Sequence, residues 1–313
     1  MNFLGRLDRD TMPPMIASVI IPTLNRPRAI VACLDALGRQ DFTAHAYEVI
    51  VVDDGSDECL QLDPRRWADR FELRVLRQEN AGPAAARQRG VAEARGAILA
   101  FTDDDCLPAP GWLATLVAAI ELLPESMAGG STFNGLSADV CAETSQLILE
   151  IVYEHFNSDP SGAYFFASNN IAMRRSDYLA SGGFDGEFGS PAAEDREFCD
   201  RWRLQGRPLR WVPSAQVEHR HPQTLWAFTR LHYRYGRGAF LYANRRRDRN
   251  SGTMVADVGF HRSLPRRLST KLKRYPVLRR LAVVLLLAWW EVVNAVGFIS
   301  EAAASSWKRR AAH

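Results

Sequence analysis

The chain has 313 residues, of which 47% are hydrophobic and 24% charged, the profile of an ordinary globular protein. Its net charge of +3 is too small to indicate nucleic acid as a main partner, and we expect no nucleic-acid binding. The five cysteines are an odd number without metal-ligand spacing, which favours reduced thiols over a disulfide framework or a zinc site. The start, MNFLGRLDRDTMPP, lacks a continuous apolar run, so we expect no secretory signal peptide.

Short apolar runs alternate with amphipathic stretches from Ala17 to about Thr132. The predicted strands are Ser18–Ile21, Glu48–Asp53, Glu72–Leu76, Ala97–Thr102 and Met127–Ser131. The predicted helices between them are 26–39, 83–95 and 111–123. This alternation indicates βαβ units and an α/β fold with a mostly parallel sheet flanked by helices. Ligands bind at the carboxyl ends of such strands, so the polar residues that follow each strand are candidates for chemistry.

Beyond residue 135 the alternation stops. Helices are predicted at 143–156, about 194–205 and about 222–245, and strands at Tyr164–Met173, Leu209–Val212 and Ala215–Glu218. The section 262–313 is basic, then strongly apolar, then basic again, which predicts a helical C-terminal extension. We therefore expect an N-terminal extension over 1–15, an α/β domain over 16–225 and a helical region over 226–313.

Polar residues follow the first two strands. The first runs into Pro22-Thr23-Leu24-Asn25-Arg26 before a helix whose N-terminus can face an anion, although a plain turn and cap explain it as well. The second ends in Asp53-Asp54-Gly55-Ser56-Asp57. One Asp there is suited to accept the N3–H of a uracil and another to order the loop, with an ordinary Asp-Gly turn as the alternative.

A third loop, Asn80-Ala81-Gly82-Pro83, opens a predicted helix that carries Arg87 one turn in. Gly82 permits close approach of the backbone, and Pro83 suits a first helical turn. Two interpretations of Arg87 stay open, because it either faces a ligand or is a solvated charge on the helix.

The fourth strand runs straight into Asp103-Asp104-Asp105. Adjacent carboxylates repel one another, which is costly unless a cation lies among them. Asp103 and Asp105 share one side of an extended chain, because side chains alternate along it. Oxygen ligands of this kind favour Mg²⁺ or Mn²⁺, which commonly hold few protein carboxylates together with a diphosphate. A polar turn is the alternative.

Two further features lie in the second half of the chain. Glu194-Asp195 opens a predicted helix, where backbone dipoles stabilise the ionised carboxylate that a general base requires. Dipole complementarity alone explains this pair as well. His219 and His221 flank Arg220, and a metal or phosphate role for His219 stays open beside that of an ordinary packed or exposed histidine.

These motifs, in this order, closely resemble the family-2 inverting glycosyltransferases over about 16–225. The resemblance is carried by Val19-Ile20-Ile21-Pro22-Thr23-x-Asn25-Arg26, Val52-Asp53-Asp54-Gly55-Ser56, Asn80-x-Gly82-Pro83-x-Ala85-x-Arg87, Phe101-Thr102-Asp103-Asp104-Asp105 and Glu194-Asp195, where x is any residue. It implies a GT-A fold and a metal-dependent enzyme that moves a sugar from a nucleotide-diphosphate donor, with UDP favoured, to an acceptor hydroxyl. The cofactor implied is Mg²⁺ or Mn²⁺.

The resemblance also implies roles for single residues. The nucleotide-sugar site would comprise Pro22, Thr23, Asn25, Arg26, Asp53, Asp54, Arg87, Asp103 and Asp104, with Asp53 or Asp54 on the base. Asp103 and Asp105 would hold the metal, with His219 as a further contact. Asp195, supported by Glu194, would be the catalytic base of a single displacement, which needs one base and one electrophile for the leaving group.

The predicted reaction adds one sugar per encounter, because Arg201-Trp202 lacks the upstream Gln of the QxxRW motif of processive synthases. We expect a place in surface polysaccharide or glycolipid synthesis. One alternative is a non-catalytic nucleotide-sugar-binding scaffold, which has no need of all four of Asp103, Asp105, Glu194 and Asp195. The other is a sugar-1-phosphate nucleotidylyltransferase, which would show a glycine-rich loop where Pro22-Thr23-Leu24-Asn25 has no glycine.

The apolar run Leu281–Ile299 has about the length needed to cross a bilayer, with Glu291 and Asn294 on one helical face. Basic residues flank it, namely Lys271, Lys273, Arg274, Arg279 and Arg280 before it and Lys308, Arg309 and Arg310 after it. A single crossing would export one basic flank, whereas a helix in the interface or packed on the protein satisfies both. We expect association with the cytoplasmic face of the membrane, which suits a lipid-linked acceptor.

Overall fold

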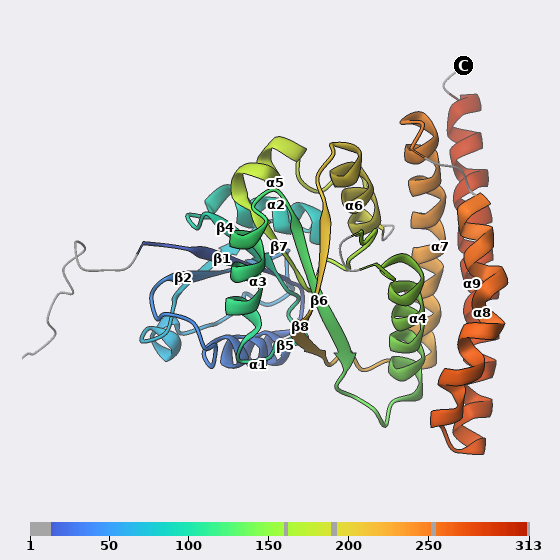
Figure 1. Cartoon of the computed structure of the whole chain (residues 1–313), viewed down its shortest axis with the longest axis horizontal. Helices are drawn as coiled ribbons and strands as arrows, with labels where there is room; N and C mark the ends of the chain where they lie inside the picture. Colours follow the sequence, from blue (N-terminus) through green and yellow to red (C-terminus); the bar gives the residue numbers. More distant parts are fainter. Residues whose placement is uncertain (1–13, 160–161, 189–192, 252–254, 312–313) are drawn as a thin grey trace, which may run out of the picture. The chain divides into compact units, whose positions relative to one another are not determined.

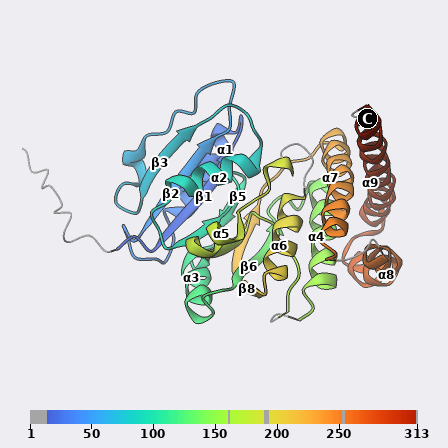
Figure 2. The same ribbon diagram turned by 90° about the horizontal axis from the view of Figure 1, so that it is seen from above.

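The computed structural model describes residues 14–159, 162–188, 193–251 and 255–311 (Figures 1 and 2). The chain forms two compact units from interleaved segments. The first comprises the described residues of Met1–Ser131, Ser168–Ala180 and Val212–Val217, and the second those of Thr132–Ala167, Ser181–Trp211 and Glu218–His313. The sequence instead predicts two consecutive domains that meet between residues 225 and 226, and this division stays a proposal.

The first unit is built on a sheet that has eight strands in the described part of the chain, in the order β3-β2-β1-β4-β7-β6-β8-β5. The strands are β1 Ala17–Thr23, β2 Tyr47–Asp53, β3 Glu72–Arg77, β4 Ile98–Phe101, β5 Cys106–Pro108, β6 Met127–Asn134, β7 Ile171–Arg174 and β8 Leu209–His219. β1 pairs in parallel with β2 and β4, and β2 with β3. β7 runs antiparallel to β4 and β6, so the sheet is mixed beyond its parallel half.

Helices flank this sheet (Figures 1 and 2). In the first unit they are α1 Pro27–Leu37, α2 Pro83–Glu93, α3 Trp112–Leu122 and α5 Arg175–Ser181, with a short 3-10 turn at Pro64–Trp67. β1 and β2 are buried along their whole length, as strands covered on both faces must be. Gly90 lets α2 approach β1, because a Cβ there would lie 2.6 Å from Ile20 Cγ2.

The second unit is mainly helical. Its helices are α4 Val140–Phe156, α6 Glu194–Leu204, α7 Leu225–Asp248, α8 Val255–Lys271 and α9 Val277–Ala311, with 3-10 turns at Gly186–Phe188 and Leu272–Arg274. α7 and α9 lie side by side and run in parallel (Figures 1 and 2), with Tyr233 Oη 2.8 Å from Ser300 Oγ and the rings of Phe240 and Phe298 5.3 Å apart. Among the described residues one helix, Val277–Trp307, is long and apolar enough to cross a membrane.

The sequence predictions of the first 132 residues are confirmed, since each predicted strand and helix there exists within a few residues. The strand predicted at Tyr164–Met173 is wrong over its first part, because only Ile171–Arg174 is a strand. Side chains bind the backbone of 164–167 instead: Asn157 bonds Tyr164 and Phe165, and Tyr153 Oη accepts from Ala167 N at 2.8 Å.

The two strands predicted at Leu209–Val212 and Ala215–Glu218 are one strand, β8. Pro213 and Ser214 lie between the predicted pieces and continue the extended backbone. Proline's fixed φ is compatible with a strand, although it cannot donate a ladder hydrogen bond.

Candidate functional site

The candidate site lies at the carboxyl ends of β1, β2 and β4. The parallel register pairs Thr23 with Asp53 and Ile20 with Phe101, so the segments that follow these strands leave the sheet at one edge. Pro22, opposite Val52, is still part of β1. The crevice at this edge is where open α/β sheets bind ligands.

Asn25 joins the loops that follow β1 and β2. Its backbone N donates to Ser56 Oγ at 2.8 Å, its Nδ2 donates to Asp57 Oδ2 at 3.0 Å, and its Oδ1 accepts from Asp57 N at 2.8 Å. The backbone φ of Asn25 is +56°, a conformation that Asn adopts more readily than most residues. Asn25 therefore holds the two loops together.

Asp53 and Asp54 are both buried, and both order loops. Asp53 Oδ1 accepts from Ser56 N at 2.9 Å, and its Oδ2 accepts from Arg77 Nη1 at 3.0 Å. Asp54 fastens the segment before α2, because Oδ1 accepts from Gln78 Nε2 at 2.8 Å and Ala81 N at 2.9 Å, and Oδ2 accepts from Gly82 N at 2.8 Å. Gly82 itself has φ +89°, which favours glycine.

Each of the three consecutive carboxylates has a hydrogen-bond donor beside it. Arg87 Nη2 donates to Asp103 Oδ1 at 2.7 Å, and Arg26 Nη1 lies 3.1 Å from Asp104 Oδ1 and 2.6 Å from Asp105 Oδ2. Thr23 Oγ1 donates to Asp104 Oδ2 at 2.7 Å. Two guanidinium groups therefore offset the mutual repulsion that the sequence led us to expect. Burial still raises the pKa of Asp104 to about 6, although the charge of Arg26 opposes the rise.

The donor set fits a hard divalent cation. The carboxylates of Asp103 and Asp105 supply the oxygen ligands that Mg²⁺ and Mn²⁺ prefer. The Asp103 side chain is 30% exposed and so is accessible to a ligand, whereas Asp104 is enclosed by Thr23 and Arg26. Asp105, which also pairs with Arg26, is 6% exposed, so Asp103 is the most accessible of the three side chains.

The second unit carries Glu194 and Asp195 in the first turn of α6. Glu194 Oε2 accepts from Ala193 N at 3.2 Å, and Asp195 Oδ1 accepts from Arg196 N at 2.8 Å. Ala193 precedes the helix with φ +109°, a strained backbone for a residue with a Cβ. Both carboxylates therefore lie at the positive end of the helix dipole, as expected.

Arg201, two turns further along α6, fixes the segment before the helix. It donates to the carbonyls of Ser181 and Gly183 and to both carboxylate oxygens of Glu197, at 2.8 and 2.9 Å. His219 is the last residue of β8, and its ring stacks on that of His221 with centroids 5.7 Å apart. Arg201 therefore orders the segment before α6, and His219 lies beside His221.

One alternative left open by the sequence is now decided. Arg87 is 2% exposed and pairs with Asp103, so it is not a solvated charge on the helix. The structure gathers ten predicted residues in the first unit, namely Pro22, Thr23, Asn25, Arg26, Asp53, Asp54, Arg87, Asp103, Asp104 and Asp105. Glu194, Asp195 and His219 belong to the second unit.

Sequence reasoning missed Arg77 and Gln78, which bind Asp53 and Asp54 from the end of β3. The sequence signal that could have revealed these two residues is the alignment of the two parallel strands, since Asp53 of β2 is paired with Arg77 of β3. Asn170 was also missed. It is fully buried, and its amide bonds Trp112 Nε1 at 2.8 Å and the carbonyls of Ser131 and Ala215 at 3.0 Å each.

Comparison with curated proteins finds relatives that match part of the chain. The glycosyltransferase AglE of Haloferax volcanii is 37% identical over 124 residues, which are 39% of this chain and 40% of that protein. Hyaluronan synthase of Pasteurella multocida is 27% identical over 239 residues, 66% of this chain and 24% of that protein. The matched region thus spans well under half the length of these relatives.

Among solved structures, the chain resembles the mannosyltransferase PcManGT from Pyrobaculum calidifontis, determined in complex with GDP-Man and Mn²⁺. The TM-score is 0.66 at 20% identity, covering 95% of this chain and 88% of that one. This likeness confirms the predicted GT-A-type fold. The model of glycosyl transferase family 2 matches residues 18–179, and that of glycosyl transferase family group 2 matches residues 103–306. The chain therefore belongs to glycosyl transferase family 2.

Proposed function

We propose that this chain is an inverting glycosyltransferase that moves a sugar from a nucleotide diphosphate to an acceptor hydroxyl. The observation that carries the proposal is the set of three carboxylates after β4, which Arg26, Arg87 and Thr23 hold in place. The loops after β1 and β2 end at the same edge of the sheet, where Asn25, Asp53 and Asp54 order them. Neither alternative function, a non-catalytic scaffold or a nucleotidylyltransferase, requires both these three carboxylates and the Glu194-Asp195 pair.

In this proposal the nucleotide base is bound by Asp53. A carboxylate oxygen can accept two hydrogen bonds. Asp54 accepts three hydrogen bonds, from Gln78, Ala81 and Gly82, whereas the contacts described above give Asp53 two. Asp53 is therefore better able to take the N3–H of a uracil, and Asp54 is the loop organiser. UDP is the favoured donor on the family resemblance, and Pro22 lines the base pocket.

Asp103 and Asp105 would hold a Mg²⁺ or Mn²⁺ ion, with His219 as a third ligand. A divalent cation bound there stabilises the negative charge of the leaving diphosphate. Arg87 orients Asp103, and Arg26 orients Asp105, since each donates a charge-assisted hydrogen bond. Asp104 is committed to Thr23 and Arg26 and acts on the nucleotide-sugar site through them.

Asp195 is the proposed general base. The acceptor oxygen forms a bond to the anomeric carbon while the bond from that carbon to the diphosphate oxygen breaks, and the hydroxyl proton passes to the Asp195 carboxylate. Glu194 supports this role because it bonds Ala193 N and so fixes the first turn of α6. Loss of a general base typically slows a reaction by about 10²- to 10⁴-fold.

The proposed acceptor is a hydroxyl of a surface polysaccharide or of a lipid-linked sugar, and one sugar is added per encounter. We place the reaction at the cytoplasmic face of the membrane. The apolar helix α9 supports a membrane location for the enzyme and hence a membrane-proximal acceptor.

A titration of UDP, GDP and dTDP, each with Mn²⁺, with Mg²⁺ and with EDTA, tests donor binding by thermal shift. We expect one nucleotide to stabilise the chain, and we expect EDTA or Asp105→Ala to abolish that effect. No stabilisation by any nucleotide in a folded sample would contradict the proposal, whereas nucleotide binding without turnover would favour the scaffold. Turnover of the matching sugar nucleotide then tests the base, because Asp195→Asn should bind the nucleotide normally yet lose turnover.

A further inference from the structure

The helix α9 has two apolar faces, and one of them is exposed. Val283, Leu287, Trp290 and Val293 are buried, and their spacing of three to four residues defines one face. A second row follows the same spacing and is between 52% and 84% exposed. We call it the outer stripe: Leu278, Leu281, Leu285, Val292, Val296 and Ile299.

The buried face of α9 is locked onto α7 at backbone distance. A Cβ at Gly236 would lie 2.1 Å from Asn294 O, and a Cβ at Gly297 would lie 2.2 Å from Tyr233 O. Arg237 and Glu301 form an ion pair of 2.6 Å at the same interface. α9 cannot leave α7 without breaking this packing.

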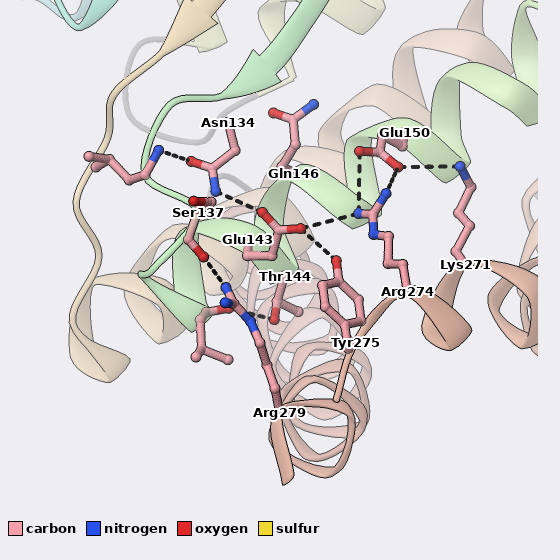
Figure 3. A network of polar contacts seen from close by, with 12 residues as sticks. Asn134, Ser137, Glu143, Thr144, Gln146, Glu150, Lys271, Arg274, Tyr275 and Arg279 are labelled. Carbon is pink, nitrogen blue, oxygen red and sulfur yellow. Dashed lines mark hydrogen bonds and ion pairs between the residues drawn. The ribbon is translucent and has the colours of Figure 1, made fainter. Parts of the chain in front are cut away.

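The segment from the end of α8 to the first turn of α9 is held on α4 and on the loop before it by a polar network (Figure 3). Tyr275 Oη donates to Glu143 at 2.6 Å, and Lys271 and Arg274 pair with Glu150 at 3.2 and 3.1 Å. Arg279 donates to the carbonyl of Ser137. Lys271, Arg274 and Arg279, three of the five basic residues before the apolar run, therefore make contacts within the protein. The side chains of 308–310, in the other flank, lie outside the described residues.

We propose that α9 lies in the plane of a membrane interface, with the outer stripe in the acyl region, and that it does not cross the bilayer. A crossing α9 would have to carry α7 with it, and α7 has Arg230, Arg234 and Arg237 in its middle. An arginine at the centre of a bilayer is costly, and a crossing α7 would place three of them there. An in-plane helix keeps α7 on the protein side and buries only the outer stripe.

Length, aromatic residues and charge favour a lipid surface over a second protein as the occupant. The outer stripe extends for roughly 32 Å at 1.5 Å per residue, without a charged member. Trp289 lies at its margin, where its Nε1 donates to Thr229 Oγ1 at 2.9 Å, and Trp226 is exposed one turn before Thr229. Tryptophan is enriched at membrane interfaces.

α8 lies beside α9 in Figures 1 and 2 and carries the exposed residues Arg262 and Arg266, and exposed Lys273 follows α8. These three positive charges complement an anionic lipid headgroup. The inference goes beyond the proposed reaction, and it holds whatever sugar or acceptor the enzyme uses. Its failure would leave nucleotide binding by the first unit untouched.

Flotation of the purified full chain with preformed vesicles tests the surface. We expect binding to phosphatidylcholine vesicles that contain phosphatidylglycerol, and weaker binding to phosphatidylcholine alone. Leu281→Glu combined with Leu285→Glu should reduce the partition constant about tenfold or more, since two anchoring leucines are lost. The matched control is Leu122→Glu, at a leucine of α3 that is 70% exposed and lies off the stripe. It should bind like the unchanged chain.

The variants must have the same thermal midpoint and the same nucleotide affinity as the unchanged chain. Weaker vesicle binding then results from the changed surface and not from unfolding. Vesicle binding that survives Leu281→Glu/Leu285→Glu would overturn the proposal. The proposal would also be overturned if the unchanged chain did not bind vesicles but formed a dimer, and if the double variant were monomeric. In that case the outer stripe would bind a second copy of the chain.

Protease accessibility separates an in-plane helix from a crossing one. A C-terminal tag on the full chain should be digested in inside-out membrane vesicles of the expression host, where the cytoplasmic face is outside, and protected in intact spheroplasts. Digestion of the tag in spheroplasts would show that α9 crosses the membrane, and the proposal would be wrong.

Discussion

Arg87 Nη2 lies 2.7 Å from Asp103 Oδ1, although the arginine is almost completely buried on α2. A buried guanidinium is costly unless it is paired, so the pair fixes the first carboxylate after β4. Arg87→Met should weaken nucleotide binding in the presence of Mn²⁺ by about 10- to 100-fold, the equivalent of about 1.5–3 kcal/mol for a charged hydrogen bond. Isothermal titration calorimetry measures this change.

The matched control for that variant is Arg89→Met on the same helix. Arg89 is half exposed, and its nearest partner, Glu93, is 3.9 Å away. An exposed pair of this kind contributes little, so the dissociation constant should hardly move. Similar losses for both variants would mean that net charge, and not the Arg87–Asp103 pair, controls nucleotide binding.

Gly236 is the tightest point between α7 and α9. A Cβ there would lie 2.1 Å from Asn294 O, which is backbone and cannot rotate away. Gly236→Ala should therefore force the helices apart and lower the free energy of unfolding by about 1–3 kcal/mol, the usual cost of overpacking. Urea denaturation followed by circular dichroism measures it. Gly186→Ala is the control, since no described atom lies within 4 Å of a Cβ there, and unchanged stability of Gly236→Ala would contradict the packing.

Much of the first unit could be predicted from sequence because its signals are local. β2 is apolar from Val49 to Val52 and runs into Asp53-Asp54-Gly55, and the acidic run after β4 follows a buried strand. Gly82-Pro83 marks the start of α2 in the same way. Strand ends, turn residues and helix starts of this kind need no knowledge of distant partners.

The parts that sequence reasoning missed depend on partners far along the chain. Residues 164–167 are apolar and aromatic, which suits a strand, but Tyr153 on α4 and Asn157 directly after it bind their backbone. Arg274 looks like a solvated or lipid-facing charge until Glu143 and Glu150 are placed beside it, 3.3 and 3.1 Å away. The partners of Arg26 and Arg87 were likewise set by tertiary structure, and one sequence does not reveal them.

His232 on α7 should make stability depend on pH. Burial lowers the pKa of His232 to about 3, and Ser145 Oγ lies 3.3 Å from its Nε2. An unfolded histidine has a pKa of about 6.5, so between these values the unfolded chain binds a proton that the folded chain does not. Stability is therefore complete above about pH 6.5 and is lost as the pH falls towards 3.

The expected loss from this histidine is about 2 kcal/mol between pH 7 and pH 5. Urea denaturation at a series of pH values measures it, and the readout is the difference in slope between the unchanged chain and His232→Gln. The variant should lose that part of the pH dependence even if its stability at pH 7 also changes. Identical slopes in the two proteins would show that His232 does not remain neutral in the folded chain.

Glu197 should couple the stability of α6 to turnover. Its carboxylate is fully buried and accepts hydrogen bonds from Arg201 on the same helix and from Arg249, directly after α7. Arg201 also donates to the carbonyls of Ser181 and Gly183. Glu197→Gln keeps the shape but removes the charge that both guanidinium groups share. Breaking a buried pair costs about 3–5 kcal/mol, so we expect a clear fall in thermal midpoint.

The same variant should lower kcat more than it changes KM for the sugar nucleotide. Glu197 lies one turn after Glu194-Asp195, and a shift of that turn misplaces the proposed base without touching the nucleotide loops of the first unit. Glu121→Gln, at an exposed glutamate of α3, is the control and should change neither quantity. A Glu197→Gln enzyme with lower stability but unchanged kcat would make the cluster purely structural. An unchanged midpoint would mean that Arg201 and Arg249 find other acceptors.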